Sequence, residues 1–377
     1  MTVTVELCVD YQPRFRPTVF GLFARATVHT AGAWMLTTPN ADIPDPIAAG
    51  IDSIRVFDDD REIYAGRVAY PDDSGSLTAG VTRTIQRSGR FLQFDGADVF
   101  GAHLATRLAY PNPATEEPWN VAYDTRTGPA STVAASYISA NLGPTAPLTA
   151  RRDTNLIVLN PTPIGTSGTW QARAQPVADI VGQVCEEGGI VCDATIDSLD
   201  RPQFAFRTPT DRTGSVVFTD TIDVDTMTAV TRPASATKVI AAGQGELEAR
   251  AFASANTGAT GRNRVERLHE DTTAETTAGL ARAASTVLAD SAAAVYADPQ
   301  LATSESYRYG RDYYLGDTVT LTLGGIDYPV IVYGVEIDIT VERDRVVPIL
   351  GTAPRDGEAL RIRQLRDIAD RQARTLD

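Results

Sequence analysis

The chain has 377 residues, of which 43% are apolar and 22% charged, and its formal net charge at pH 7 is −14. This length suffices for two or three domains that each bury a core, while the lack of any run of about 18 apolar residues argues against a membrane-spanning helix. The acidic balance opposes binding to a nucleic-acid backbone, and the first residues, MTVTVELCVDYQ, predict a strand and not a signal peptide.

The first 96 residues have the pattern of β-structure. Two segments predict hairpins: residues 54–70, which turn at Asp58-Asp59-Asp60, and residues 82–96, which bend at Ser88-Gly89. Aspartate side chains can bond to the local backbone in such turns, and short strands at this spacing indicate a small sandwich or barrel. We therefore expect an N-terminal β domain over residues 1–96.

The middle of the chain, residues 97–214, alternates helical and extended patterns. Helices are predicted at residues 97–108, 130–141 and 176–187, and short strands at residues 156–159 and 203–207. The third helix has proline at its start and Gly188-Gly189 at its end, which are the residues favoured at these positions. The region is therefore interpreted as an α+β insertion between two β-rich ends.

From residue 215 the β pattern returns. Strands are predicted near residues 215–218, 229–231 and 237–242. A long amphipathic helix is predicted over residues 274–296, with its apolar side chains on one face. The apolar side chains of this helix are Leu280, Ala284, Val287, Leu288 and Val295, and Asp298-Pro299 ends it.

Residues 307–351 contain the clearest alternating pattern in the chain. Gly324-Gly325 can adopt the positive φ angles of a tight hairpin turn. In both arms apolar residues alternate with polar ones, so each strand is expected to bury one face and expose the other. The return arm alternates Val335, Ile337, Ile339 and Val341 with Glu336, Asp338, Thr340 and Glu342. This pattern predicts an acidic outer face. Residues 353–377 predict an amphipathic helix.

No group of residues has the spacing of a catalytic, cofactor or metal site. The candidates are His269-Glu270-Asp271, Asp58-Asp59-Asp60, Gly243-Gln244-Gly245, Ser88, Glu116-Glu117 and Glu186-Glu187. The first two lack the spaced ligands of zinc or calcium sites, and the glycine pair lacks the third glycine of a dinucleotide loop. Ser88 is not in a nucleophile elbow, and adjacent acids in so acidic a chain are normally solvated. We expect no enzyme and no cofactor.

Two features leave alternatives open. The cluster of Tyr307, Tyr309, Tyr313 and Tyr314 could stack on sugar rings, but packing at the mouth of a barrel is favoured. Cys185 and Cys192 could form a disulfide across Gly188-Gly189. The odd count of three cysteines, with Cys8 as the third, favours reduced and buried thiols.

Short motifs stand out at both ends of the chain. In the C-terminal part they are Asp312-Tyr313-Tyr314-Leu315-Gly316-Asp317-Thr318-Val319, Val335-Glu336-Ile337 and Val347-Pro348-Ile349-Leu350-Gly351. In the N-terminal part they are Ile63-Tyr64-Ala65-Gly66-Arg67-Val68, Ser88-Gly89-Arg90 and Phe94-Asp95-Gly96-Ala97-Asp98. Together they resemble the tail-tip baseplate-hub proteins of long-tailed (siphovirus) actinobacterial phages. The resemblance is vague from about residue 110 to 250.

The resemblance implies a β-rich α+β fold with two tail-tube-like β-barrel or sandwich domains. The implied division is a first tube-like domain at 1–96, an inserted α+β region at 97–214, a second tube-like domain with a long helix at 215–352, and a C-terminal amphipathic helix at 353–377. Three copies would form a homotrimeric hub at the tail tip of the virion. Such a hub connects or caps the tail tube and forms part of the DNA-exit path.

The implied partners are the distal tail protein, the tape-measure protein and other tip proteins, and the chain itself would be made in the host cytoplasm before it joins the virion. DNA would pass through transiently without stable binding. We therefore expect the pore-facing surface to be acidic and not lined by arginines such as Arg55 or Arg67. The alternatives are a distal tail or other tip protein, a carbohydrate-binding adhesin that uses the tyrosine cluster, and, least favoured, a cell-wall enzyme.

Overall fold

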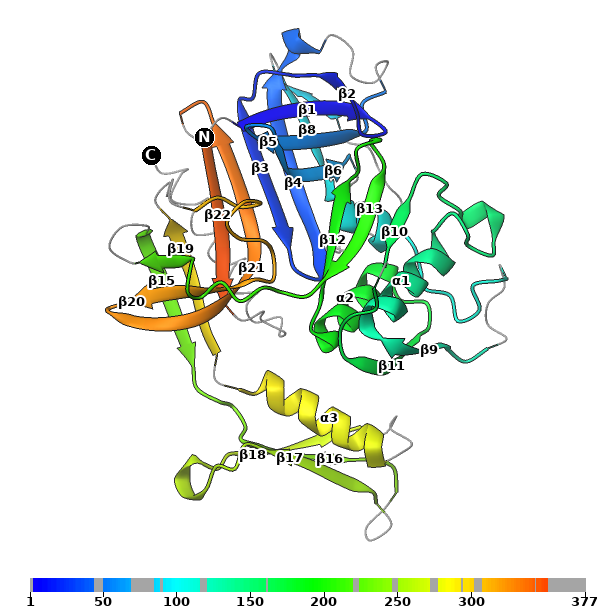
Figure 1. Cartoon of the computed structure of the whole chain (residues 1–377), viewed down its shortest axis with the longest axis vertical. Helices are drawn as coiled ribbons and strands as arrows, with labels where there is room; N and C mark the ends of the chain where they lie inside the picture. The colour runs from blue at the N-terminus through cyan, green and yellow to red at the C-terminus, as the bar shows by residue number, and fades with distance from the viewer. Residues whose placement is uncertain are drawn as a thin grey trace. The chain divides into compact units, whose positions relative to one another are not determined.

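The computed structural model describes most of the chain (Figure 1). The described residues are 3–43, 50–68, 85–88, 91–115, 121–160, 162–219, 224–245, 250–271, 277–292, 294–301, 307–342 and 344–351. The chain divides into two compact units, residues 1–226 with 300–350 and residues 227–299 with 351–377. This division differs from the expected domain boundaries, because residues 227–299 do not share a unit with the strands that follow them. The expected helix at 353–377 lies outside the described residues.

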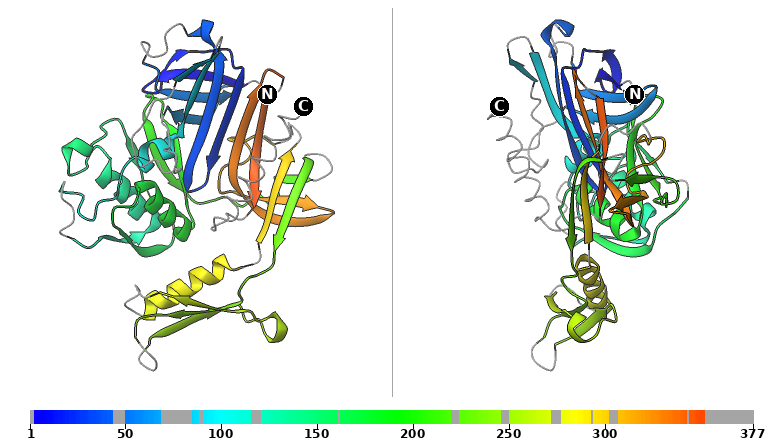
Figure 2. Two further views of the ribbon diagram at one scale, coloured as in Figure 1. Left: turned by 180° about the vertical axis from the view of Figure 1, so that it is seen from behind. Right: turned by 90° about the vertical axis from the view of Figure 1, so that its left-hand side faces the viewer.

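Strands from both ends of the chain form one continuous sheet in the first unit. Blue strand β3 lies between orange strand β21 and blue strand β4 in Figure 1, and blue and orange strands lie side by side again in Figure 2. The order is β22-β21-β3-β4-β8-β6-β5-β1-β2, with β7 beside β8, β20 beside β21 and β14 beside β20. These strands are β1 (Val3–Val9), β2 (Gln12–Phe15), β3 (Gly21–Thr27), β4 (Thr30–Pro39), β5 (Ser53–Asp58), β6 (Arg61–Arg67), β7 (Ile85–Ser88), β8 (Phe91–Asp98), β14 (Val217–Thr219), β20 (Thr318–Leu323), β21 (Ile326–Thr340) and β22 (Asp344–Gly351). The two β-rich ends found in the sequence are thus joined through the β21–β3 pair.

The predicted hairpins of the first unit are confirmed. β5 and β6 pair around a turn in which Asp59 has a φ of 54°, and β7 pairs with β8. Gly324 and Gly325 form the β20–β21 turn with φ angles of 54° and 80°. The core of this unit contains large aliphatic and aromatic side chains, including those of Leu7, Leu22, Leu36, Ile54 and Phe94.

Strand β21 exchanges its buried and exposed faces near Gly334. The buried side chains are Val330 and Val332 before this point and Val335, Ile337 and Ile339 after it. The change coincides with a change of partner, from β20 to β3. A Cβ atom at Gly334 would lie 3.0 Å from the carbonyl oxygen of Ala26, so the close strand approach favours glycine. Val341, expected on the buried face, instead lies beyond the strand and is 68% exposed, which corrects the prediction.

The inserted region packs helices α1 (Ala130–Asn141) and α2 (Val177–Gly188) together with short sheets. Both helices are confirmed. α2 begins after Pro176 and ends at Gly189, which has a φ of 67°. The strands are β9 (Asp124–Pro129), β10 (Ile157–Leu159), β11 (Ser167–Ala172), β12 (Val191–Ile196) and β13 (Pro202–Arg207), and the short helix η4 covers Thr149–Arg151.

The helix predicted at residues 97–108 is shorter than expected. Strand β8 continues to Asp98, and a single π-helical turn, η2 (Gly101–Ala105), follows it. The Asp98 carboxylate accepts hydrogen bonds from the backbone N–H groups of Gly101 at 2.7 Å and Gly32 at 2.9 Å. These bonds hold Asp98 between the strand and the turn, and burial raises its pKa to about 6.

The second unit contains a three-stranded sheet covered on one face by a helix (Figure 1). The sheet order is β17-β16-β18. Its elements are β16 (Lys238–Ala242), β17 (Phe252–Asn256), η6 (Gly261–Asn263), β18 (Glu266–Glu270) and α3 (Thr277–Asp290). The long helix predicted to residue 296 ends at Asp290, because the β-forming residues that follow belong to β19 (Ala294–Leu301). Strands β15 (Val224–Arg232) and β19 cross the boundary between the units.

Among the described residues, no helix combines the length and apolar character needed to cross a membrane. The short helix η1 (Asn40–Asp42) directly follows β4. All three cysteines are free thiols. Burial raises the pKa of Cys8 to about 12 and that of Cys185 further, so both remain protonated thiols at pH 7.

Candidate functional site

The exposed face of the continuous sheet carries an apolar pair between two carboxylates. Phe23 of β3 lies opposite Asp338 of β21 on one side and Met35 of β4 on the other, and Met35 lies opposite Asp95 of β8. Phe23 is 37% exposed and Met35 43% exposed. Directly opposite residues share a face of the sheet, so these four side chains form one row. Arg25 and Glu336 form the neighbouring pair on the same face. We call these six residues the open sheet face.

Charge on the open sheet face is predominantly negative. Arg25 donates a hydrogen bond to Glu336 at 2.8 Å, and its guanidinium carbon lies 6.0 Å from the centre of the Phe23 ring. Partial burial raises the pKa of Asp95, and the Gln93 amide, which donates to its carboxylate at 3.3 Å, opposes this shift. The six residues of the open sheet face thus present three carboxylates and one guanidinium, whose charge is directed at Glu336. Arg67 of β6 continues the Arg25 row through Ala33 and Ala97, and its charge is directed at Asp52 and Asp10.

The two arginines considered as pore-lining candidates form ion pairs with side chains of the first unit. Arg55 lies 2.5 Å from Glu62 and 2.7 Å from Asp200, and its side chain is only 13% exposed. Arg67 lies 2.9 Å from Asp52 and 3.2 Å from Asp10. Their charges are therefore directed at neighbouring carboxylates.

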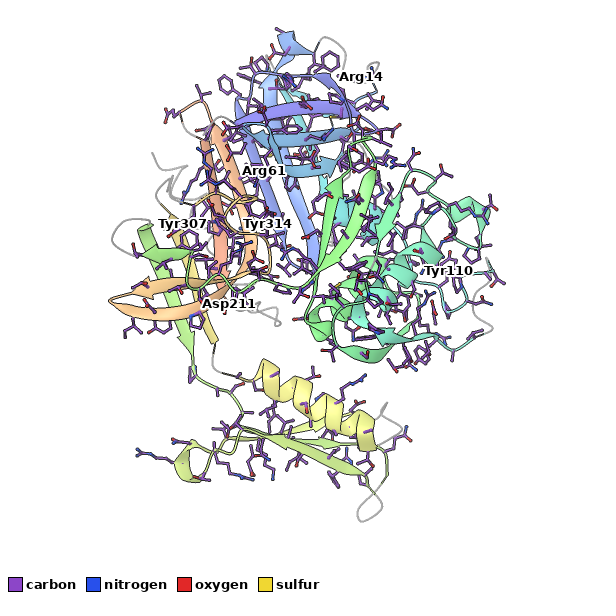
Figure 3. All side chains as sticks on the ribbon, in the orientation of Figure 1. Arg14, Arg61, Tyr110, Asp211, Tyr307 and Tyr314 are labelled. Atoms are coloured by element: carbon purple, nitrogen blue, oxygen red, sulfur yellow. The ribbon has the colours of Figure 1, made fainter. Side chains whose placement is uncertain are left out.

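Most of the tyrosine cluster is packed into the first unit. Tyr313 is 1% exposed and lies edge-on to Phe218, with 5.8 Å between ring centres. Tyr307 also lies edge-on to Phe218, with 5.6 Å between ring centres. Figure 3 shows Tyr307 and Tyr314 in this unit. Burial raises the pKa of Tyr309 above its ordinary range. Only Tyr314 exposes as much as 38% of its surface, so packing accounts better for the cluster than a sugar platform does.

Asp317 forms a buried ion-pair centre that sequence reasoning missed. Its side chain is fully buried and lies 2.9 Å from Arg207 and 2.7 Å from Arg212. The backbone N–H groups of Thr210 and Tyr314 donate to the same carboxylate at 3.0 and 3.1 Å. Both guanidinium groups also lie within 6 Å of the Tyr314 ring centre. The centre therefore ties the chain before β14 to the loop before β20.

The aspartate turn at residues 58–60 serves a similar structural role. Arg308 lies 2.8 Å from Asp59 and 3.8 Å from Asp58, and Arg61 donates to the carbonyl oxygen of Gly310. These contacts join the β5–β6 hairpin to the tyrosine segment. The turn is thus occupied by cationic side chains of the protein itself.

The remaining sequence candidates are dispersed. His269 and Glu270 lie on β18 in the second unit, Ser88 ends β7, and Gly245 lies after β16 with a φ of 108°. Glu187, near the end of α2, accepts a hydrogen bond from the indole of Trp170 at 2.8 Å, while Glu116-Glu117 lies outside the described residues. Within the described ranges, no three His, Cys, Asp or Glu side chains come together as a metal site.

A buried polar bridge links the sheet to the inserted region. The hydroxyl of Tyr11, in the turn after β1, lies 3.1 Å from Nε2 of His103 in η2. Nδ1 of His103 lies 3.8 Å from Asp153. Burial lowers the pKa of His103 to about 4, so the imidazole is neutral at pH 7 and acts as a hydrogen-bonding partner. His103 belongs to the segment predicted as a helix over residues 97–108, and the structure places it in the π-helical turn.

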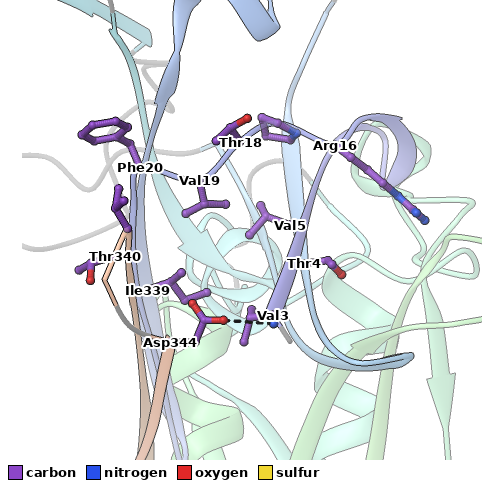
Figure 4. Close-up of a pocket in the computed structure, with 12 residues that line it drawn as sticks. Val3, Thr4, Val5, Arg16, Thr18, Val19, Phe20, Ile339, Thr340 and Asp344 are labelled. Carbon is purple, nitrogen blue, oxygen red and sulfur yellow. Dashed lines mark hydrogen bonds between the residues drawn. The ribbon is translucent and has the colours of Figure 1, made fainter. Parts of the chain in front are cut away.

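A shallow groove of about 450 Å³ lies where the first and last strands of the first unit meet (Figure 4). The Asp344 carboxylate accepts a hydrogen bond from the backbone N–H of Val3 at 3.4 Å. Phe20, at the groove, is 48% exposed and its ring centre lies 4.6 Å from that of Phe91. The groove is mainly apolar and contains no cluster of titratable side chains.

Comparison with known proteins places these features in a family. The family model described as "Siphovirus ReqiPepy6 Gp37-like protein" matches residues 64–352. The fold is similar to that of the 43 kDa tail protein of prophage MuSo2 from Shewanella oneidensis, with a TM-score of 0.60, 11% identity, and coverage of 93% of this chain and 98% of that one. No curated protein sequence matches the chain.

Two further solved structures share the fold. Prophage tail protein gp18 from Listeria monocytogenes gives a TM-score of 0.58 at 9% identity, with 98% of this chain and 100% of that one covered. The tail protein from Neisseria meningitidis gives 0.56 at 11% identity, with 93% and 96% covered. At such low identity these likenesses establish the fold and not the details of function.

Proposed function

The chain belongs to the Siphovirus ReqiPepy6 Gp37-like protein family of phage tail proteins, and we propose that it is the hub of the tail tip in a long-tailed phage of actinobacteria. It is a structural tail protein and not an enzyme, as are the family and the solved structures that it resembles. In the proposed hub, three copies form a ring that connects or caps the tail tube. The ring surrounds the path by which DNA leaves, and it contacts the distal tail protein, the tape-measure protein and other tip proteins.

The observation that carries this proposal is the continuous sheet of the first unit. Three copies match the sixfold symmetry of a tail tube when each copy contributes two equivalent β regions, because the ring then contains six of them. The β21–β3 pair aligns the C-terminal β region with the N-terminal one edge to edge. The two tube-like domains of the proposal are these two regions of the sheet, and their open sheet face is the surface we assign to the lumen.

The distribution of charge supports the same assignment. The first unit contains 21 arginines and 35 acidic residues, whereas the rest of the chain contains 13 basic and 13 acidic residues. The formal charge of −14 therefore belongs entirely to the unit that carries the continuous sheet. A lumen lined with carboxylates repels phosphates, so DNA would pass without binding.

The trimer is testable by the mass of the purified protein. We expect mass photometry to show particles near 121 kDa, three times the 40.4 kDa of one chain. Addition of the distal tail protein is expected to increase the trimer fraction if assembly needs that neighbour. Monomers alone, both with and without the neighbour, would contradict the proposal.

Reversing charge on the open sheet face is expected to make the hub retain DNA. The double variant Asp95→Arg/Asp338→Arg changes each copy by four charge units on a single face. In phage carrying it, we expect DNA release triggered in vitro to slow at least about tenfold at low salt, because each new phosphate contact adds salt-dependent affinity. Release should recover as the salt concentration rises.

The matched control is Asp60→Arg/Asp211→Arg, which makes the same charge change at two exposed residues outside the open sheet face. Release is expected to stay close to that of the wild type. Equal slowing by both variants would assign the effect to net charge, and no slowing by the first would remove the open sheet face from the DNA path.

A further inference from the structure

The second unit carries positive charge at one end of its sheet. Strand β16 begins there at Lys238, and the connection from β17 to β18, which contains η6, covers residues 256–267 together with the first residues of β18 (Figure 1). The pairing registers place Lys238 opposite both Asn256 and Glu266, so these segments lie at the same end of the sheet. We call Lys238 and residues 256–267 the second-unit tip.

The charge of the second-unit tip is opposite to that of the chain as a whole. The tip contains four cations and one carboxylate, hence a formal charge of +3, in a chain of −14. The cations are Lys238, Arg262, Arg264 and Arg267, and the carboxylate is Glu266. At physiological ionic strength, charges further away than about 8 Å are largely screened. A ligand at the tip therefore meets the local positive charge and not the net charge of the chain.

Three of the four cations have no anion of their own. Within the part of the chain that the structure describes, no carboxylate lies within ion-pair distance of Lys238, Arg262 or Arg267. Arg264 lies 2.6 Å from Glu266, and Lys238 is opposite the same residue in the next strand. Arg262 and Arg267 are exposed. Because successive residues of a strand point to opposite faces, Lys238 and Arg267 place positive charge on both faces of the sheet.

The composition of the second-unit tip favours phosphate over a protein surface as its ligand. Val265 is the single apolar side chain of the tip that is larger than alanine, whereas protein interfaces rely on buried aromatic or large apolar anchors. Gly258 and Gly261 have φ angles of 83° and 58°, and no atom lies within 4 Å of their Cβ positions, so a ligand can approach the backbone closely. Guanidinium groups and small polar side chains are common partners of phosphate oxygens.

We propose that the second-unit tip binds the phosphate backbone of double-stranded DNA through Lys238, Arg262 and Arg267. The contact is independent of base sequence, because the tip has no aromatic side chain to stack on a base. It is weak, since about three phosphate contacts are too few for stable binding at physiological salt. The inference rests on the proposed function only in naming DNA as the phosphate polymer.

Salt-dependent binding of a short duplex of mixed sequence to the purified full chain tests the site, with fluorescence anisotropy as the measurement. We expect a plot of log affinity against log salt concentration to have a slope of about −3, since each phosphate contact contributes about −0.9. In Arg262→Ser/Arg267→Ser the slope should become shallower by about 2, and the affinity at low salt should fall at least about tenfold. No salt-dependent binding by the wild type would overturn the proposal.

The matched control is Arg14→Ser/Arg107→Ser, which removes the same charge from two exposed arginines of the first unit. Its slope and affinity should stay close to those of the wild type. An equal loss in both serine variants would assign the binding to net charge and contradict the site. Arg262→Lys/Arg267→Lys keeps both charges and should keep the slope, which separates loss of charge from loss of folding. If the lysine variant also lost the slope, charge at these positions would not be the cause of binding.

Competition identifies the class of polymer. Unlabelled duplex is expected to displace the labelled duplex at least about tenfold more efficiently, per charge, than poly-L-glutamate does, because duplex DNA carries one charge per about 1.7 Å and releases condensed counterions. Equal displacement would assign the second-unit tip to an acidic protein surface and overturn the assignment to DNA. Binding is measured in whatever oligomeric state the chain has, so its failure is distinguishable from failure of the proposed trimer, which the particle mass reports.

Discussion

Replacing Asp317 by alanine is expected to lower the free energy of unfolding of the first unit by about 3–5 kcal/mol, the usual effect of breaking a buried ion pair from one side. The carboxylate is fully buried and accepts from Arg207, Arg212 and two backbone N–H groups. Its loss leaves the partly buried Arg212 without its carboxylate partner and leaves Arg207 with Asp193 alone. Urea denaturation followed by circular dichroism measures the change as a lower transition midpoint.

Two further variants separate the contribution of the Asp317 charge to stability from the contribution of its burial. Asp317→Asn keeps the shape and one acceptor oxygen but removes the charge and replaces the other oxygen by an NH2 donor, so we expect it to be destabilising, but by less than alanine is. Asp312→Ala removes a more exposed carboxylate that lies 2.7 Å from Arg311, and we expect a change below about 1 kcal/mol. Equal effects at residues 312 and 317 would show that burial of the Asp317 centre contributes nothing.

Local signals in the sequence predicted the elements that depend on local chemistry. α2 begins after Pro176 and ends at Gly189, and both residues act on the helix through their own backbone conformations. The Gly324-Gly325 turn was predicted for the same reason. The long helix was predicted six residues too far, because small residues such as the Ser-Ala-Ala-Ala run at 291–294 fit either a helix or a strand.

Features that depend on distant residues could not be predicted in this way. Asp317 is 110 residues from Arg207 and 105 from Arg212 along the chain, so no local pattern reveals the centre. The exchange of faces in β21 depends on β3 as its second partner, more than 300 residues away. The alternating pattern identified the acidic residues of β21. The other members of the open sheet face could be found only from the pairing registers of β3, β4 and β8.

A second large effect on stability is expected at Gly96, where the pairing of β8 with β4 and β6 leaves no room for a side chain. The indole of Trp34 lies between Gly66 and Gly96 and donates a hydrogen bond to the carbonyl oxygen of Ala97 at 3.2 Å. A Cβ atom at Gly96 would overlap the carbonyl oxygen of Arg67 and lie 2.5 Å from Nε1 of Trp34. Gly96→Ala is therefore expected to lower the free energy of unfolding by about 3 kcal/mol, at the upper end of overpacking effects.

The cost is large because the obstructing atom belongs to the backbone. Arg67 pairs with Ala97 in the β6–β8 ladder, so moving its carbonyl away from Cβ breaks the sheet contact that closes the N-terminal strands. A smaller residue in place of Trp34 would not relieve the overlap. Gly214→Ala is the matched control, since no atom lies within 4 Å of its Cβ position; we expect no loss, and a gain of up to about 1 kcal/mol. If urea titrations gave the two variants the same transition midpoint, the steric account would be contradicted, and the close contacts of Gly96 with Trp34 and Arg67 would not explain why glycine is needed.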